Sequence, residues 1–308
     1  MLAVLALTGP IFLVIAAGYV ATRIGLFERA EMRVFGKYVI NIALPALLFN
    51  ALSQRSVAEV LNPVFVAAYA SGGVLAMLLG ILWARRFAHK SVSASAIVGM
   101  GMSCPNSGFI GFPLVAQAFG AATAGIGLAL AMVVENFILL PLALAIADSG
   151  GSGSLGAAMR QSLKALSRNP MIWGIASGFA FSLFGWHLPE PVAKAVNLLA
   201  MSTGAISLFV IGGSLVGIHI GGMKRDVAVI AVGKLLLHPL LVCGLVYLLP
   251  PMARELQVAV ILMAAVPMLG IYPILAQKHG HDGMAAAAQL GTTVASFFTL
   301  TALLWAIA

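Results

Sequence analysis

Long apolar runs separated by short polar stretches dominate the pattern of this chain of 308 residues. A helix needs about 20 mostly apolar residues to cross the hydrocarbon core of a bilayer. The pattern therefore predicts an all-α polytopic membrane protein with ten transmembrane helices. The predicted spans cover residues 3–22, 34–52, 63–84, 92–119, 122–147, 170–187, 191–217, 226–249, 255–277 and 283–307.

Basic residues gather in alternate loops between these spans. Loops one, three, five, seven and nine hold 13 Lys and Arg residues, whereas loops two, four, six and eight hold 3. Cytoplasmic loops carry the excess of Lys and Arg in membrane proteins. The distribution predicts that both termini lie outside, and it leaves Lys234 as the cation far from the ends of its predicted span.

The composition excludes an ordinary soluble domain. Hydrophobic residues make up 61% of the chain and charged residues 8%, against about 25% charged residues in a soluble domain. The net charge of +8 comes from cations in the loops, where topology accounts for them, so no nucleic-acid partner is predicted. Cys104 and Cys243 both lie in apolar runs, so neither a disulfide framework nor a metal site is predicted.

One polar stretch divides the apolar runs into two groups of five. It covers residues 148–169 and begins with a Ser/Gly run, which is typical of a flexible linker. Within it, residues 155–166 have the spacing of an interfacial amphipathic helix. The predicted organisation is a first five-span repeat at 1–147, a cytoplasmic linker at 148–169 and a second five-span repeat at 170–308.

The second group of spans matches the first at an offset of 160 residues. The matches include helix-punctuating residues as well as apolar ones. They are Pro10 and Pro170, Gly18 and Gly178, Gly25 and Gly185, Phe49 and Phe209, Pro113 and Pro273, Ala116 and Ala276, Gln117 and Gln277, Gly120 and Gly280, and Phe137 and Phe297. Because five is odd, the second copy enters from the opposite side, and the predicted repeat is inverted.

Proline and glycine interrupt spans four and nine. Residues 105–113 read Pro-Asn-Ser-Gly-Phe-Ile-Gly-Phe-Pro, and residues 267–273 read Pro-Met-Leu-Gly-Ile-Tyr-Pro. Proline removes an amide donor and clashes one turn back, so both helices are predicted to break within the membrane. Broken helices persist where they face protein or a water-filled cavity, and half-helix N-termini suit a carboxylate. The alternative is a pair of structural kinks in a packed bundle.

Residues 106–114, Asn-Ser-Gly-Phe-Ile-Gly-Phe-Pro-Leu, resemble the span-four signature of the auxin efflux carrier family, whose bacterial members include malonate-transporter-like proteins. The resemblance extends to Gly18 and Tyr19, to residues 41–45 and to the overall length. It implies two inverted five-span repeats, a scaffold domain, and a crossover domain in which broken helices four and nine cross. It also implies elevator-like transport of organic anions across a bacterial inner membrane.

Two charged residues lie well inside predicted spans and are candidates because burying a charge is unfavourable. Glu135, next to Asn136, carries a proton, pairs with a cation, or serves as a structural carboxyl group. Lys234 shares a helix face with His238. Lys234 either snorkels to the interface, pairs with Glu135 or contacts an anionic substrate.

The predicted substrate site lies around the two breaks, with one amide from span two. Its residues are Asn106, Ser107, Gly108, Phe109, Phe112, Pro113, Pro267, Gly270, Tyr272, Pro273 and Asn41. The residues predicted for coupling or charge pairing are Glu135, Asn136 and Lys234.

These features favour a secondary transporter that moves a small carboxylate, such as a dicarboxylate or an auxin-like acid, by alternating access. The chain has no P-loop and no His-Glu-x-x-His motif, so neither ATP drive nor enzymatic activity is predicted. A passive channel or a membrane sensor remains the alternative. The predicted partners are an organic anion and the lipid bilayer. No cofactor is predicted, while homodimerisation and coupling to sodium, protons or the membrane potential stay open.

Overall fold

A computed structural model describes residues 2–55, 61–149, 156, 160, 168–218 and 223–307, with side chains from Leu7 onward. These residues are helical apart from turns and connecting segments, and a single isolated antiparallel β-bridge joins Pro105 and Met268. The chain divides into two compact units, and each draws on both halves of the sequence. Unit 1 comprises Met1–Asn62, Gly108–Leu130 and Ser167–Gly217, and unit 2 comprises Pro63–Ser107, Ala131–Leu166 and Ile218–Ala308.

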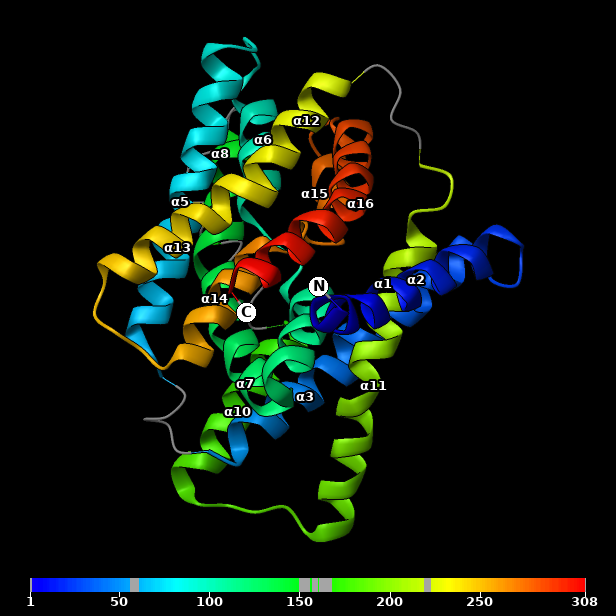
Figure 1. The fold of residues 1–308 in the computed structure, drawn as a ribbon, viewed down its shortest axis with the longest axis vertical. Coiled ribbons are helices and arrows are strands. Elements are labelled where there is room, and N and C mark those ends of the chain that lie inside the picture. Colours follow the sequence, from blue (N-terminus) through cyan, green and yellow to red (C-terminus); the bar gives the residue numbers. More distant parts are fainter. Residues whose placement is uncertain are drawn as a thin grey trace. The chain divides into compact units, whose positions relative to one another are not determined.

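Unit 1 is built on two helix pairs, in which α1 packs against α11 and α10 packs against α3 (Figure 1). Glycine permits both contacts. A Cβ at Gly18 would lie 2.0 Å from the carbonyl oxygen of Phe209, and a Cβ at Gly178 would lie 3.1 Å from that of Phe49. The paired helices therefore approach each other closely along their backbones. The helices of unit 1 are α1 (Leu2–Arg23), α2 (Arg29–Tyr38), α3 (Leu44–Ser53), the first part of α7 (Phe112–Val134), α10 (Pro170–Phe184) and α11 (Glu190–Ser214).

In unit 2, α5 contacts three other helices of the unit, α6, α13 and α14. A Cβ at Gly72 of α5 would lie 2.5 Å from the side chain of Val242 in α13, so glycine again sets a close approach. A further contact brings α16 beside α15 and α12. The helices of unit 2 are α5 (Pro63–Arg86), α6 (Val92–Ser103), the end of α7, α8 (Leu140–Ser149), α12 (Lys224–Val232), α13 (His238–Leu248), α14 (Arg254–Ala265), α15 (Tyr272–Gln277) and α16 (Asp282–Ile307).

Helices occupy each of the ten apolar runs identified in the sequence, which confirms an all-helical, multi-pass membrane protein. Among the described residues, six helical stretches are long and apolar enough to cross a bilayer. These are Arg29–Ser53, Pro63–Arg86, Ser107–Ser149, Glu190–Ser214, Lys224–Leu248 and Asp282–Ile307. Shorter apolar helices cover Leu7–Arg23, Val92–Ser103 and Pro170–Phe184. The amphipathic helix predicted at 155–166 lies outside the described residues except at 156 and 160.

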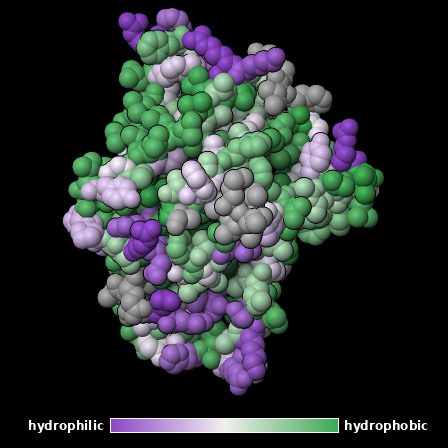
Figure 2. All heavy atoms as spheres, in the orientation of Figure 1, coloured by the Kyte–Doolittle hydropathy of each residue, from purple (hydrophilic) through white to green (hydrophobic). Residues whose placement is uncertain are grey.

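The surface of unit 2 separates hydrophobic from hydrophilic residues. In Figure 1, α5 ends and α12 begins at the upper edge of the view, and Figure 2 shows hydrophilic atoms there above a mainly hydrophobic surface. These helix ends expose Arg85, Arg86, Lys224 and Arg225. An apolar helical body with a basic end is the pattern of a helix surrounded by lipid that ends in water.

Four prolines follow a short, widened turn of helix. Proline lacks an amide hydrogen and its ring clashes with the carbonyl four residues earlier, so the helix relaxes into a wider π turn. Each π turn ends two residues before its proline. The turn at Ser107–Gly111 lies within the predicted break of span four. The turns are Val39–Ala43, Ser107–Gly111, Glu135–Leu139 and Gly233–Leu237, and the prolines are Pro45, Pro113, Pro141 and Pro239.

Two pairs of glycines separated by 160 residues share a left-handed backbone. The φ angles are 81° at Gly25 and 63° at Gly185, which follow α1 and α10. They are 84° at Gly120 and 74° at Gly280. Gly120 kinks α7 between predicted spans four and five, and Gly280 lies between α15 and α16. Glycine adopts such angles without steric strain, so the same turns occur at matching places of the two sequence halves.

Candidate functional site

The predicted breaks in spans four and nine are present, and within unit 2 the two breaks pair with each other. The chain becomes extended after α6 and after α14. The amide of Asn106 donates to the carbonyl oxygen of Pro267 at 2.8 Å, and the amide of Leu269 donates to that of Cys104 at 3.1 Å. A backbone inside a membrane must satisfy its polar groups internally. Each break here supplies partners for the other.

Glu135 is buried in unit 2 and accepts hydrogen bonds from two hydroxyls at the same oxygen, Oε1. Tyr69 donates at 2.7 Å, and Ser107 donates a short hydrogen bond. The two hydroxyl oxygens are also 3.1 Å apart. These donors offset part of the hydration that the carboxyl group loses on burial. Because Ser107 belongs to the first break, the acid is tied directly to the broken segment.

Lys234 is fully buried, so its amino group does not reach the interface by snorkelling. Its Nζ donates to the carbonyl oxygen of Ala264 at 2.5 Å and lies 3.2 Å from Nδ1 of His238. The ring centroids of His238 and Tyr69 are 6.1 Å apart. Glu135 and Lys234 attract each other electrostatically without a direct ion pair.

These contacts form a buried polar chain through unit 2. It runs from the first break to the last turn of α14, next to the second break, and its two hydrogen-bonded parts meet where the ring of Tyr69 in α5 contacts that of His238 in α13. Its members are Ser107, Glu135, Tyr69, His238, Lys234 and the carbonyl group of Ala264.

The second break is fixed to α6 by Tyr272. This side chain is fully buried, and its hydroxyl donates to the carbonyl oxygen of Ile97 at 2.9 Å. The missing side chain of Gly101 makes space for this hydroxyl, since a Cβ at Gly101 would lie 2.6 Å from the hydroxyl oxygen of Tyr272. The carbonyl of Gly270 accepts a hydrogen bond from Gln289 of α16 at 3.2 Å. Pro273 lies in the first turn of α15. The residues of the second break thus have defined packing roles within unit 2.

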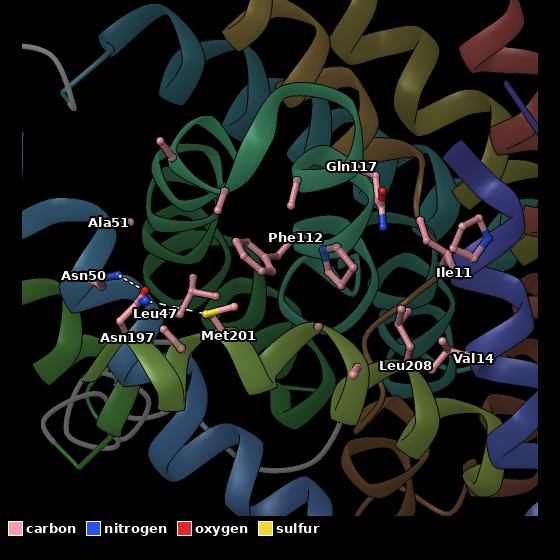
Figure 3. Close-up of a pocket in the computed structure, with 18 of the residues that line it drawn as sticks. Ile11, Val14, Leu47, Asn50, Ala51, Phe112, Gln117, Asn197, Met201 and Leu208 are labelled. Atoms are coloured by element: carbon pink, nitrogen blue, oxygen red, sulfur yellow. Dashed lines mark hydrogen bonds between the residues drawn. The ribbon is translucent and has the colours of Figure 1, made fainter. Parts of the chain in front are cut away.

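Unit 1 contains a pocket of about 900 Å³, a size typical of small-molecule sites. Two residues of the predicted site, Phe112 and Pro113, line it. Figure 3 shows Phe112 near the middle of the pocket, with amide and aliphatic side chains on both sides of it. The labelled amides are Asn50, Asn197 and Gln117, and the labelled aliphatic residues are Ile11, Val14, Leu47 and Leu208.

The polar side of this pocket is a row of hydrogen-bonded amides. Asn50 donates to the side-chain oxygen of Asn197 at 3.1 Å, and Gln54 donates to that of Asn50 at 2.6 Å. We call these three residues the amide row. Arg55 also lines the pocket, although the sequence assigned it to a loop. A carboxylate or another polar head with a short apolar body would match this lining chemically.

Gly108 and Phe109 are the first two residues of the second segment of unit 1, Gly108–Leu130. Phe109 is four residues before Pro113, and the hydroxyl of Ser207 donates to its carbonyl oxygen at 3.0 Å. Proline has no amide hydrogen to donate to that carbonyl. A Cβ at Gly108 would lie 3.2 Å from the side chain of Leu44, so the glycine allows close packing there.

Two predicted residues donate their side-chain amides to their own helices. Asn41 is exposed and donates to the carbonyl oxygen of Lys37 at 2.7 Å, and it does not line the pocket. Asn136 donates to the carbonyl oxygen of Met132 at 2.8 Å. Neither bond brings the residue into the buried polar chain or the amide row.

Sequence reasoning did not single out Tyr69 or Asn197. Tyr69 lies in the middle of an apolar span, where a single tyrosine hydroxyl does not by itself indicate a functional residue. Asn197 lies about two turns into α11, between apolar residues. Among the described residues, no group of three His, Cys, Asp or Glu side chains could hold a metal ion.

Comparison with known proteins identifies the family of this chain. Residues 4–306 match the family described as "Membrane transport protein". The chain is 25% identical to the "Uncharacterized transporter YfdV" of Escherichia coli (strain K12), over 96% of this chain and 94% of that protein. It is 27% identical to a "Putative malonate transporter" of Rhizobium meliloti, over 97% and 94%. An "Uncharacterized transporter" of Methanothermobacter thermautotrophicus is 25% identical over 96% and 95%. The chain therefore belongs to the membrane transport protein family, the auxin efflux carrier family that its span-four sequence resembles.

Proposed function

We propose that this membrane transport protein is a secondary transporter that moves a small organic anion across the bacterial inner membrane by alternating access, with an elevator-like movement. The observation that carries the proposal is the pairing of two broken helices in unit 2. Paired breaks in corresponding positions of two sequence halves are the pattern expected at the binding site of an inverted-repeat transporter.

Packing in unit 1 supports ten spans in two inverted repeats, at 1–147 and 170–308 around the linker at 148–169. Gly18 packs on Phe209, while Gly178, 160 residues after Gly18, packs on Phe49, 160 residues before Phe209. Such an exchange of partners is what a two-fold relation between two copies produces. The paired left-handed glycines support the same relation.

The distribution of cations supports the proposal that both termini lie outside, and two ion pairs in unit 2 support the number of spans on which it depends. Lys90 and Asp226 are 2.8 Å apart, and Lys278 and Asp148 are 2.9 Å apart. Each pair joins segments that the distribution of cations assigns to the cytoplasmic side. One span more or fewer between the partners of a pair would place them on opposite faces.

The substrate we propose is a small mono- or dicarboxylate, and malonate is the first compound to test because one relative carries that name. Around the breaks, the residues proposed to bind it are those that the sequence indicated. They are Asn106, Ser107, Gly108, Phe109, Phe112, Pro113, Pro267, Gly270, Tyr272, Pro273 and Asn41, with Glu135, Asn136 and Lys234 in coupling or charge pairing. The pocket beside Phe112 adds the amide row.

Counterflow in proteoliposomes tests this function. Vesicles loaded with unlabelled malonate should accumulate labelled malonate transiently, with saturable kinetics. Non-saturating flux without counterflow would indicate a channel, and a thermal shift with malonate but no flux would indicate a sensor. Asn106→Ala should yield a protein that survives purification but loses counterflow, because it alters the break that faces the substrate.

A further inference from the structure

A buried lysine, Lys234, donates a hydrogen bond to the last turn of α14. The final carbonyl groups of a helix lack amide partners within the helix, and this end carries partial negative charge. Helix α14 ends at Ala265, two residues before Pro267. Nζ of Lys234 donates to the carbonyl oxygen of Ala264 at 2.5 Å, and no part of Lys234 is exposed.

This is the kind of position that coupling ions occupy in other transporters. Broken helices commonly coordinate sodium with unwound carbonyl groups and with the C-terminal ends of half-helices. A lysine amino group and a sodium ion satisfy such an end in the same way, through positive charge directed at carbonyl oxygens. Here the amino group of Lys234 already donates a hydrogen bond to the carbonyl oxygen of Ala264.

The surroundings of Lys234 also fit a cation site. Glu135 supplies the opposite charge within unit 2, held in place by Tyr69 and Ser107. His238 turns Nδ1 toward the amino group at 3.2 Å. With Nδ1 accepting, the imidazole proton is on Nε2, which is buried without a hydrogen-bond partner.

We propose that Lys234 is a tethered cation that takes the place of a coupling sodium ion at the end of α14, so that transport does not depend on sodium. The inference rests on the proposed transport function, and it names how the site is coupled. It predicts that the protein acquires a sodium site when the lysine is shortened. Removing the amino group leaves the carbonyl of Ala264 without its cation, and it leaves space for a small ion.

Thermal unfolding of the purified full chain tests the inference without any substrate. The protein is compared in sodium, potassium and choline chloride at equal ionic strength. The melting temperature of the wild type should be the same in all three salts. Lys234→Ala should melt lower by on the order of 10 °C in choline, and sodium or methylammonium should restore a large part of the loss.

Two variants serve as controls. Lys234→Met fills the space with an apolar chain of similar length, so its loss should not be restored by any cation. Lys194→Ala removes an exposed lysine paired with Glu190 on α11, and it should melt like the wild type in every salt. Selective stabilisation of the wild type by sodium would overturn the inference, as would a Lys234→Ala protein that no cation restores.

Transport provides the second measurement, and it covers the case in which Lys234→Ala does not fold. Wild-type uptake of malonate should be equal with external sodium and with choline, whereas at least a tenfold dependence on sodium would overturn the inference. If no organic anion shows counterflow, the proposed function fails, while the melting experiment still decides whether Lys234 holds the cation position.

Discussion

Gly18 of α1 packs directly against the backbone of Phe209 in α11, where a Cβ would lie 2.0 Å from the carbonyl oxygen. No side-chain rotation can relieve an overlap with a backbone atom, so any larger residue must push the helices of unit 1 apart. The contact makes α1 and α11 a single packed pair, and it has a counterpart between Gly178 and Phe49.

We expect Gly18→Ala to destabilise the protein by about 2 kcal/mol or more, since overpacking a tight contact costs about 1–3 kcal/mol. Gly9→Ala is the matched control, because it lies in the same helix and a Cβ there meets no atom within 4 Å. Gly178→Ala should be intermediate, since its nearest contact is 2.9 Å away. Thermal unfolding in detergent measures all three. Equal melting temperatures for Gly18→Ala and Gly9→Ala would contradict the close approach of α1 and α11.

Tyr69→Phe should destabilise the protein by about 2 kcal/mol, because a hydrogen bond to a charged group contributes about 1.5–3 kcal/mol. The hydroxyl that is lost donates to Glu135 at 2.7 Å. Tyr38→Phe is the control. Its hydroxyl bonds to that of Ser202 at 2.8 Å in a partly buried, uncharged pair, so the loss should be about 1 kcal/mol. A larger loss for Tyr38→Phe would show that Glu135 does not depend on Tyr69.

Many helices and both breaks could be predicted from the sequence, because apolar runs and prolines determine the structure of the segment in which they lie. Runs of apolar residues located the helices, and Pro113 and Pro267 located the breaks. The positive φ angles of Gly120 and Gly280 lie where the repeat placed turns. In each case, the residue itself determines the local geometry.

The partners of the candidate site were less predictable, because they depend on which helices meet. Glu135 stood out as an intramembrane acid, but its nearest donor, Tyr69, lies 66 residues earlier on another helix. The sequence allowed Lys234 to snorkel to the interface, whereas in the structure its amino group donates to the carbonyl oxygen of Ala264. Long-range approach of this kind leaves no periodic trace in a single sequence.

Stability should fall as the pH drops below about 6.5, through His279 in the turn before α16. Burial lowers the pKa of His279, and the nearby Asp148, 3.6 Å away, only partly opposes this effect. The unfolded state then binds a proton more readily than the folded state, so the stabilisation present above the unfolded pKa is lost as the pH falls toward the folded pKa. His279→Gln should therefore flatten the dependence of the melting temperature on pH between pH 7 and 5.

Cysteine labelling in intact cells should place Lys194 outside and Arg86 inside. Both side chains are exposed and lie near the ends of long helices, α11 and α5. In a Cys243→Ala background, where Cys104 is buried, Lys194→Cys should react with an impermeant thiol reagent, and Arg86→Cys should react only after permeabilisation. The reverse pattern would invert the proposed topology.

The final prediction is that the protein recognises a carboxylate mainly through amides and backbone N–H groups, and only weakly through arginine. The amide row provides neutral donors in the pocket, while Arg55, although it lines the pocket, is an exposed side chain just beyond the end of α3. An exposed charge in water contributes about 1 kcal/mol or less, so Arg55→Gln should weaken malonate binding less than tenfold.

Asn197→Ala should also weaken binding, because it removes an amide and breaks the hydrogen bond with Asn50. Malonamide should bind much less tightly than malonate, since it lacks the negative charge that the donors stabilise. Lys194→Gln, which removes a cation from α11 outside the pocket lining, controls for net charge and should bind normally. Binding is measured by thermal shift or calorimetry. Complete loss in Arg55→Gln with intact folding would move the anion contact onto that guanidinium, and tighter binding of the amide would exclude an anionic substrate.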